Sequence, residues 1–227
     1  MGKNILVVLT SHDRLGETGH QTGFWLEELA TPYYAFKDAG AVVTLASPDG
    51  GKPPLDPKSD DVSAETPATI RFKADTVANE QLANTARLQD VDASNFDAVF
   101  YPGGHGPLWD LIDNEQSIKL IEAFWAQGKP VSAVCHAPIA LVNAKDENGD
   151  FIVKGREVTG FTNEEEEAVG LTNIVPQLVE DVMIERGANY SKKESWASFA
   201  CKDGNLITGQ NPASSEAVAE LLLKALV

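Results

Sequence analysis

The chain has 227 residues, with 18 lysines and arginines against 34 aspartates and glutamates, so its formal net charge is −16 and its pI is near 4.5. Such an acidic protein repels phosphate backbones and anionic lipid head groups, which argues against nucleic acid and membrane partners. A hydrophobic content of 43% is ordinary for a chain that folds around a core, and it argues against disorder.

The first half of the chain predicts a β-α-β unit followed by a long excursion. Residues 5–10 form an apolar run typical of a strand buried on both faces. That run is too short for a signal peptide or a membrane span, so we expect a cytoplasmic protein. Residues 24–39 place apolar side chains on one helical face, and Pro32 is expected to kink or divide this helix. Residues 41–46 predict the second strand, and residues 50–92 are a polar excursion.

The second half of the chain continues the alternation of strands and helices. Residues 96–101 predict a strand that ends in a glycine cluster, and residues 131–134 predict another strand. Helices are predicted at 116–127, 175–186 and 214–226, and a last strand at 206–208. These elements predict one α/β domain over residues 1–227, a flavodoxin-like three-layer sandwich with a mostly parallel central sheet and helices on both faces.

Cys135 stands directly after the strand at 131–134, where the ligands of open α/β sheets bind. A cysteine between a strand and a helix has the geometry of a nucleophile elbow, and the helix N-terminus favours the reactive thiolate. Most free cysteines are simply small buried residues, but the neighbouring His136 favours a functional role. The second cysteine, Cys201, precedes a predicted hairpin turn, and we expect it to be structural.

Two further features lie near the predicted strand ends. The backbone N–H groups of Gly103 and Gly104 have the character of an oxyanion site, although a glycine pair is also an ordinary turn. Glu27 and Glu28 lie early in the first helix, and a carboxylate near the thiol can exchange protons with it. From their spacing alone, two exposed glutamates on a solvated helix face are a better interpretation than a catalytic carboxylate. The spacing also does not distinguish Glu27 from Glu28.

The histidines outside the Cys135 region form no metal-binding motif. His12, His20 and His105 are irregularly spaced, so we expect loop or pocket-lining roles and no metal site. The four tryptophans are typical of core packing. Trp109 is the one we consider for a pocket, because it follows the loop that contains His105.

Five segments of the chain carry a resemblance to a known family. They are Glu28-Leu-Ala-Thr-Pro32, Tyr101-Pro-Gly-Gly-His-Gly106, Ala133-Val-Cys-His-Ala-Pro138, Thr159-Gly-Phe-Thr-Asn163 and Thr208-Gly-Gln-Asn-Pro-Ala-Ser-Ser215. With them the sequence resembles, from end to end, the PfpI/ThiJ superfamily of class I glutamine amidotransferase-like proteins, in its branch of glyoxalase III enzymes and heat-inducible chaperones. Residues 50–92 are then an excursion specific to this branch.

The resemblance also implies roles for particular residues. Glu28 corresponds to the family's glutamate beside the nucleophilic cysteine, here Cys135. His136 and an acidic residue beyond the Gly-Phe-Thr motif complete a Cys-His-acid triad, and the family spacing suggests Glu166, with the run at 164–167 leaving the register open by one residue. The candidate oxyanion and substrate-binding residues are Gly103, Gly104, His105, Trp109 and Phe161.

The activity implied by the resemblance is conversion of methylglyoxal, or a related 2-oxoaldehyde, to a 2-hydroxy acid without glutathione, metal or organic cofactor. We therefore expect no cofactor, a small carbonyl compound as substrate, and a homodimer. As a hypothesis, the Cys135 thiolate attacks the aldehyde, and Glu28 or His136 moves a proton between adjacent carbons through an enediol. The resulting thioester is hydrolysed by water.

Several other functions of the superfamily are alternatives. One is a stress-response chaperone, a protein deglycase or a redox sensor oxidised at Cys135. Less favoured are isonitrile hydration and amide hydrolysis. Proteolysis by subunit rings is disfavoured because this chain is longer, and glutaminase activity because no downstream His-x-Glu motif is present. Replacing Cys135 by serine distinguishes a chaperone from an enzyme that uses the thiol.

Overall fold

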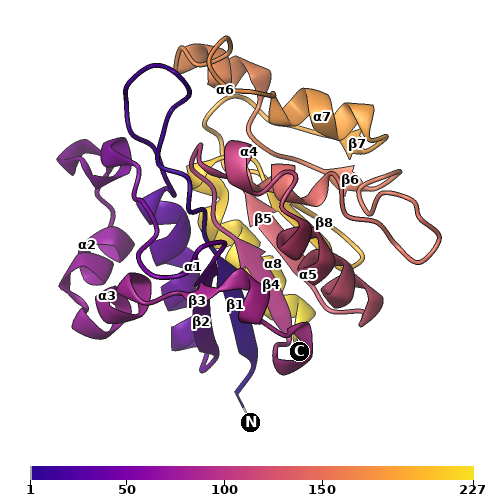
Figure 1. Ribbon diagram of the computed structural model, residues 1–227, viewed down its shortest axis with the longest axis horizontal. Coiled ribbons are helices and arrows are strands. Elements are labelled where there is room, and N and C mark those ends of the chain that lie inside the picture. The colour runs from indigo at the N-terminus through magenta and orange to yellow at the C-terminus, as the bar shows by residue number, and fades with distance from the viewer. Residues whose placement is uncertain (1) are drawn as a thin grey trace.

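The computed structural model describes residues 2–227, and a seven-stranded sheet forms its centre (Figure 1). The strand order is β3-β2-β1-β4-β5-β9-β8, and every neighbouring pair is parallel except β8 and β9. The strands are β1 (Asn4–Val8), β2 (Val42–Ser47), β3 (Ala86–Arg87), β4 (Ala98–Tyr101), β5 (Val131–Val134), β8 (Ala200–Asp203) and β9 (Leu206–Gly209). A separate parallel pair joins β6 (Glu157–Val158) to β7 (Asn189–Tyr190). The prediction of a mostly parallel sheet is confirmed.

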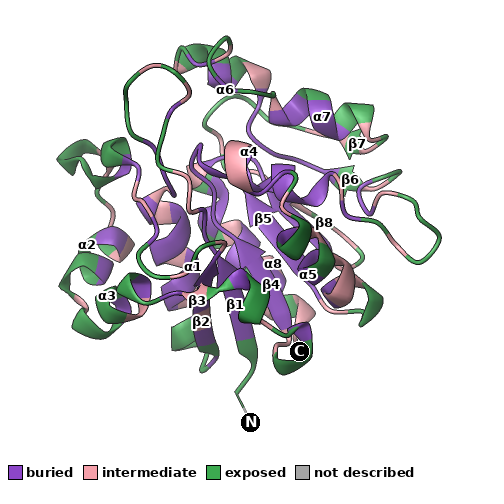
Figure 2. Cartoon of the chain, in the orientation of Figure 1, coloured by how far each residue is buried: buried purple, intermediate pink, exposed green. Residues whose placement is uncertain are grey.

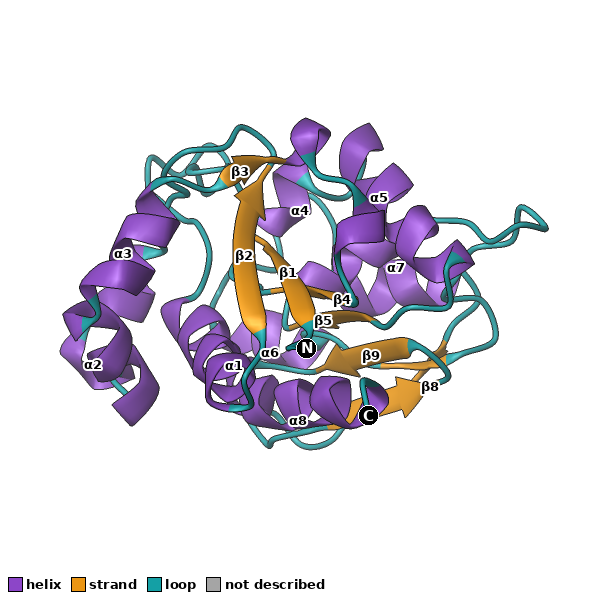
Figure 3. Cartoon of the chain, turned by 90° about the horizontal axis from the view of Figure 1, so that it is seen from below, coloured by secondary structure: helices purple, strands orange, loops and turns teal. Residues whose placement is uncertain are grey.

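Helices cover both faces of this sheet (Figure 3). The first face carries α1 (Leu26–Asp38), α2 (Pro67–Ala74), α3 (Thr76–Ala83) and α8 (Ser215–Ala225). The second carries α4 (Pro107–Asp110), α5 (Glu115–Ala126) and α7 (Val179–Glu185), while α6 (Asn163–Ala168) lies above the strand ends. Within residues 2–227 no helix has both the length and the apolar character needed to cross a bilayer.

The hydrophobic core is divided into two layers by the central strands, which are buried along most of their length (Figure 2). Along β1, Leu6 and Val8 point to one face, where Phe124 of α5 packs, and Ile5 and Val7 point to the other. Alternate side chains of a strand point to opposite faces, so a strand buried on both sides must be apolar at every position. This explains why the strands read as continuous apolar runs.

Some local predictions were wrong. Pro32 does not divide the first helix, because α1 runs unbroken from Leu26 to Asp38 with Pro32 buried inside it. A proline within a helix removes one backbone hydrogen bond, and tertiary packing of the buried face compensates for that loss here. The segment after Cys135 is a 3₁₀ helix of five residues, Ala137–Leu141, and not an α-helix. The C-terminal half of the predicted helix 175–186 is correct, but α7 begins only at Val179.

The excursion at residues 50–92 packs on α1. Phe72 of α2 lies edge-on against Tyr33 and Tyr34 of α1, with ring centroids 5.5 and 6.2 Å apart. The excursion also contains β3, which pairs with β2 and so extends the same sheet. At the opposite edge Cys201 lies on β8 in the antiparallel β8–β9 hairpin, with its Sγ 3.3 Å from the hydroxyl of Thr208.

Candidate active site

The chain turns sharply at Cys135, directly after β5. The φ angle of Cys135 is 64°, in the left-handed region that residues with a Cβ rarely adopt. Its N–H donates to the carbonyl of Gly209 at 2.9 Å, and its own carbonyl accepts the N–H of Phe161 at 2.8 Å. Such a conformation costs about 1–3 kcal/mol and persists only where the surroundings hold it. The elbow expected from the sequence is therefore present.

This turn brings the side chains of two consecutive residues together. The Nδ1 atom of His136 lies 3.3 Å from the Sγ atom of Cys135, and its Nε2 atom lies 2.7 Å from Oε2 of Glu166. A carboxylate accepts only, so Nε2 carries the proton and Nδ1 offers a lone pair to the thiol. Thiol, imidazole and carboxylate thus form one hydrogen-bonded line. Within the acidic run, Glu166 is the residue that reaches the imidazole, whereas Glu164 pairs with Lys192.

The same carboxylate also binds a second imidazole. The Nε2 atom of His105 lies 2.8 Å from Oε1 of Glu166, and the ring centroids of His105 and His136 are 4.0 Å apart. Burial alone would raise the pKa of Glu166, but the two imidazoles, by hydrogen bonding to the carboxylate and by their charge when protonated, hold it well below its usual range. Burial and the neighbouring His105 lower the pKa of His136. The site therefore holds an ionised carboxylate and, near neutral pH, a neutral His136 ready to accept a proton.

Helix α6 presents Glu166 because its preceding residue is firmly anchored. Glu165 is fully buried and forms a capping box with Thr162 at the start of α6. Its Oε1 atom accepts hydrogen bonds from the side-chain amides of Gln210 and Asn211, at 3.0 and 2.8 Å. These two amides belong to the Thr-Gly-Gln-Asn-Pro segment that follows β9. The sequence did not indicate this anchoring role of Glu165. In a run of four glutamates, one buried anchor cannot be told apart from its neighbours.

Glu28 approaches the sulfur from α1. It is completely buried, its Oε2 atom accepts the N–H of Gly103 at 2.7 Å, and its carboxyl group interacts with the Cys135 thiol. The other oxygen, Oε1, has no well-formed hydrogen bond among residues 2–227. Burial raises the pKa of Glu28 to about 8. Glu27 instead accepts hydrogen bonds from Thr31 and from Thr66 of the excursion, so the structure separates the two glutamates that the sequence did not.

The resting state of Cys135 differs from the sequence-based expectation. Burial and the Glu28 carboxyl raise the pKa of the thiol well above its usual value, and the backbone N–H of Gly104 partly opposes them. The expected thiolate stabilisation by a following helix is wrong, because a 3₁₀ helix of five residues has little dipole to offer. Cys135 is 3% exposed and rests as a thiol, so its activation requires transfer of the proton to His136.

The two glycines after β4 act differently from each other. Gly103 gives its N–H to Glu28, so the expectation that both glycines face an oxyanion is wrong for Gly103. A Cβ at Gly103 would lie 2.6 Å from both Oε2 of Glu28 and the carbonyl oxygen of Val134. Gly104 has a φ of 96° and directs its N–H at the Cys135 sulfur. The close approach of these backbones therefore requires glycine at both positions.

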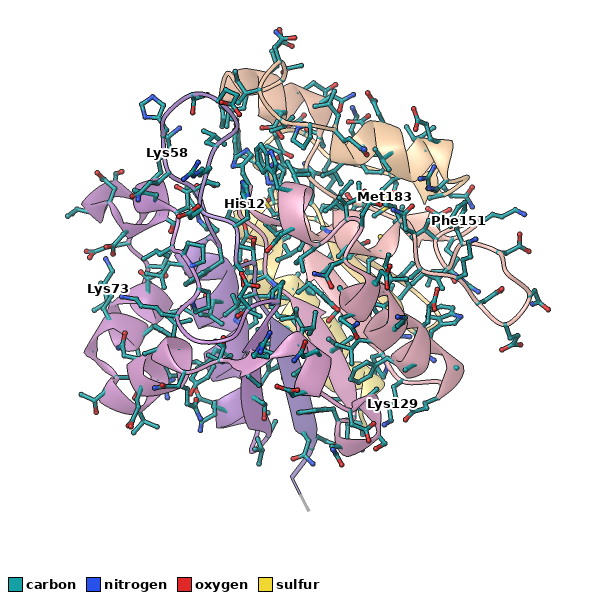
Figure 4. All side chains as sticks on the ribbon, in the orientation of Figure 1. His12, Lys58, Lys73, Lys129, Phe151 and Met183 are labelled. Carbon is teal, nitrogen blue, oxygen red and sulfur yellow. The ribbon has the colours of Figure 1, made fainter. Side chains whose placement is uncertain are left out.

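The aromatic residues around the site are only partly those expected. Phe161 packs on the ring of His136, with centroids 4.2 Å apart. Trp109, a residue of α4, stacks instead on His12, with ring centroids 5.0 Å apart (His12 is labelled in Figure 4). A cavity of about 330 Å³ adjoins the site, and its wall contains His105 and Trp25 but not Trp109. The prediction for Trp109 is therefore wrong, and Trp25, which immediately precedes α1, was missed.

The two histidines and their shared carboxylate also have the composition of a transition-metal site. One ligand atom from each of His105, His136 and Glu166 can be chosen so that all lie within 4.8 Å of one another. Both Nε2 atoms are engaged with the carboxylate, so a cation would compete with these hydrogen bonds. No other such group is found in residues 2–227, and His20 instead lines the cavity, at its exposed rim.

Comparison with known proteins places this geometry in a family. A glyoxalase 3 of Candida albicans is 30% identical over 230 residues, covering 97% of each chain, and its crystal structure superposes with a TM-score of 0.92. A glutathione-independent glyoxalase of Saccharomyces cerevisiae is 30% identical over 99% of this chain and 98% of its own. The crystal structure of a rapid encystment protein of Francisella tularensis is 39% identical over 99% of both chains, with a TM-score of 0.95.

The family itself is shown by a match that spans most of the chain. The sequence profile of the DJ-1/PfpI family matches residues 20–225, which include every residue of the site described above. This agrees with the resemblance of the five segments and with the parallel sheet that brings them together. The chain belongs to the DJ-1/PfpI family.

Proposed function

We propose that this protein is a cofactor-independent glyoxalase that converts methylglyoxal or related 2-oxoaldehydes to 2-hydroxy acids through Cys135. The observation that carries the proposal is the line from the Cys135 thiol through His136 to Glu166, with Glu28 at the sulfur. The names of the relatives that cover nearly the whole chain support the same activity.

The first step is addition of the thiol to the aldehyde. His136 accepts the thiol proton at Nδ1, the sulfur forms a bond to the aldehyde carbon, and the carbonyl π pair moves onto oxygen. Two backbone N–H groups stabilise that oxygen, those of Gly104 and His136, and the first already points at the sulfur. Glu166 keeps the proton on Nε2 of His136 and stabilises the imidazolium as it forms. The oxygen then takes up the proton to give a hemithioacetal.

The second step moves a hydrogen between the two carbons. A base removes the proton from the sulfur-bearing carbon, an enediol forms, and the neighbouring carbon is reprotonated to give a thioester. Glu28 suits this task because a carboxyl with a pKa of about 8 both accepts and donates protons near neutral pH. One carbon is oxidised while its neighbour is reduced, so no external redox partner is required. Water then cleaves the carbon–sulfur bond and releases the 2-hydroxy acid, and the thiol regains its proton.

The neighbouring residues have supporting roles in this scheme. His105 holds the second oxygen of Glu166, and thereby fixes the orientation of the carboxylate toward His136. Phe161 packs on the His136 ring and limits its rotation. These contacts preorganise the proton-transfer line, and no step needs a metal or an organic cofactor. Because the formal charge is −16, we also propose that nucleic acids and membranes are not partners. We further propose a cytoplasmic homodimer formed from single-domain subunits.

The second cysteine offers a matched control for the test. Wild type, Cys135→Ser and Cys201→Ser are incubated with methylglyoxal without glutathione, and both the loss of aldehyde and the gain of lactate are followed by NMR. The proposal expects lactate from wild type and Cys201→Ser, and none from folded Cys135→Ser. Equal lactate formation by Cys135→Ser would overturn it.

A chaperone or redox role of the kind considered above gives a different pattern. A holdase that works through apolar surface would suppress aggregation of a client protein equally well with serine at position 135. Oxidative sensing requires an accessible thiolate, and the burial and raised pKa of Cys135 disfavour that state. The structure thus favours the enzyme over the sensor.

A further inference from the structure

We propose that the cavity beside the site selects 2-oxoaldehydes that carry a bulky apolar side group over methylglyoxal. This inference rests on the proposed function, because it names the substrate class of the same site. It is carried by the size of the cavity, the chemistry of its wall and its position relative to Cys135.

The cavity is larger than methylglyoxal requires. Its volume is about 330 Å³, which is room for roughly ten water molecules at their share of liquid volume. Methylglyoxal carries a single methyl group beyond its two carbonyls and would leave most of this space to water. A cavity of this size is at the lower end of the range, about 300–1,000 Å³, that encloses larger organic ligands.

The wall of the cavity is suited to apolar groups. Leu15, Trp25, Val169 and Leu171 contribute apolar side chains, and Leu15 and Leu171 are themselves 6% and 9% exposed. Burial of apolar surface against such a wall contributes about 25 cal/mol per Å². A branched or aromatic side group gains this contribution, and a methyl group hardly does.

The less exposed polar groups in the wall are already engaged by the protein. The Asp56 carboxylate accepts hydrogen bonds from the hydroxyl of Thr22 at 2.9 Å and from the N–H of Lys58 at 2.9 Å. The hydroxyl of Thr18 donates to the carbonyl of Leu15 at 2.7 Å. The free polar side chains, His20, Gln21 and Lys58, are exposed at the rim, and Lys58 lies beside the loop of residues 11–22 (Figure 4). The buried part of the cavity therefore offers shape and apolar contact more than a polar anchor.

The cavity lies next to the residues that surround Cys135, although Cys135 itself is not in its wall. Trp25 donates its backbone N–H to the carbonyl of Gly103 at 2.9 Å, so this wall residue adjoins the glycine pair beside the sulfur. His105, also in the wall, is hydrogen-bonded to the carboxylate that holds His136. We therefore place the side group of an aldehyde bonded to Cys135 beyond Trp25 and His105, in the cavity.

The test compares three aldehydes with wild type and with cavity-filling variants. Phenylglyoxal and isobutylglyoxal are expected to give at least about ten-fold higher kcat/KM than methylglyoxal, since a few carbons in an apolar pocket discriminate by that much. Leu171→Phe and Val169→Phe each reduce the free volume and are expected to lower the ratio of phenylglyoxal to methylglyoxal kcat/KM at least about five-fold. Ile184→Phe adds the same bulk at an exposed position of α7 and is the control.

The outcomes separate this inference from the function on which it rests. Turnover of methylglyoxal with no preference for the bulky aldehydes overturns the inference and leaves the proposed function intact. The same holds if neither cavity-filling variant, both folded by circular dichroism, changes the ratio relative to Ile184→Phe. Absence of turnover of all three aldehydes by folded wild type contradicts the proposed function itself.

Discussion

The buried carboxyl of Glu28 gives the protein a pH-dependent stability that one substitution removes. Its pKa is raised from 4.5 to about 8 in the folded protein, with burial as the main cause. In the unfolded chain the group titrates near its ordinary value, so between these two values the folded state binds more protons than the unfolded state. The stabilisation from this difference is full below about pH 4.5 and is lost as the pH rises toward 8.

The expected magnitude follows from the shift. Each unit of pKa difference corresponds to about 1.4 kcal/mol, so the whole shift is worth about 5 kcal/mol, of which roughly 3–4 kcal/mol falls between pH 5 and pH 8. Glu28→Gln keeps an oxygen for the N–H of Gly103 but cannot ionise. The free energy of unfolding of wild type is therefore expected to fall more steeply over this range than that of Glu28→Gln.

Urea unfolding followed by tryptophan fluorescence at several pH values measures this difference. Other titrating groups, such as the half-buried Asp110, whose pKa burial raises to about 6, are shared by both proteins and cancel in the comparison. Two curves of unfolding free energy against pH that run parallel from pH 5 to pH 8 would refute the reasoning, since Glu28 would then have an ordinary pKa. A steeper fall of the unfolding free energy for Glu28→Gln than for wild type would also contradict it, because the pKa of Glu28 would then be lowered by folding.

Three further predictions concern the same side chains. Glu166→Gln replaces one carboxylate oxygen by an NH₂ donor, so one of the two imidazoles loses its hydrogen-bond acceptor. The kcat for lactate formation should fall about 10²–10⁴-fold, with the fold intact by circular dichroism. An unchanged kcat would contradict the role of Glu166 in proton transfer. Gly103→Ala should lower the free energy of unfolding by about 1–3 kcal/mol in urea titrations, because its Cβ meets Glu28 and the Val134 carbonyl, and wild-type stability would contradict the crowding. Zn²⁺ should inhibit turnover reversibly through the two histidines and Glu166, whereas a chelator alone should leave turnover unchanged; inhibition by the chelator would point to a required metal.

The fold was predictable because its signal lies in single segments. Strands such as β1 and β4 are buried on both faces, so their sequences are apolar at almost every position. Boundaries were less certain where packing overrides local preference. Pro32 lies within an unbroken α1, and the chain after Cys135 forms a 3₁₀ helix where its apolar residues indicated an ordinary helix.

The candidate site was predictable only in part. Cys135 and His136 are adjacent in the sequence and follow a strand, so their proximity needs only the turn. Glu166 binds both His105 and His136, which lie 61 and 30 residues before it in the sequence. Their contact depends on how distant loops meet in the fold, and no local sequence pattern predicts it. The raised pKa of Cys135 likewise arises from burial and from Glu28 on another element, which spacing does not reveal.

The most direct test of the central claim is the stoichiometry of lactate formation at Cys135. Protein freed of small thiols and treated with a chelator is given methylglyoxal, and aldehyde consumed and lactate formed are quantified for wild type and for Cys135→Ser. The account predicts one lactate per methylglyoxal over many turnovers with wild type, and no lactate with the folded serine variant. Aldehyde loss without lactate in wild type, or lactate at the same rate from Cys135→Ser, would contradict it.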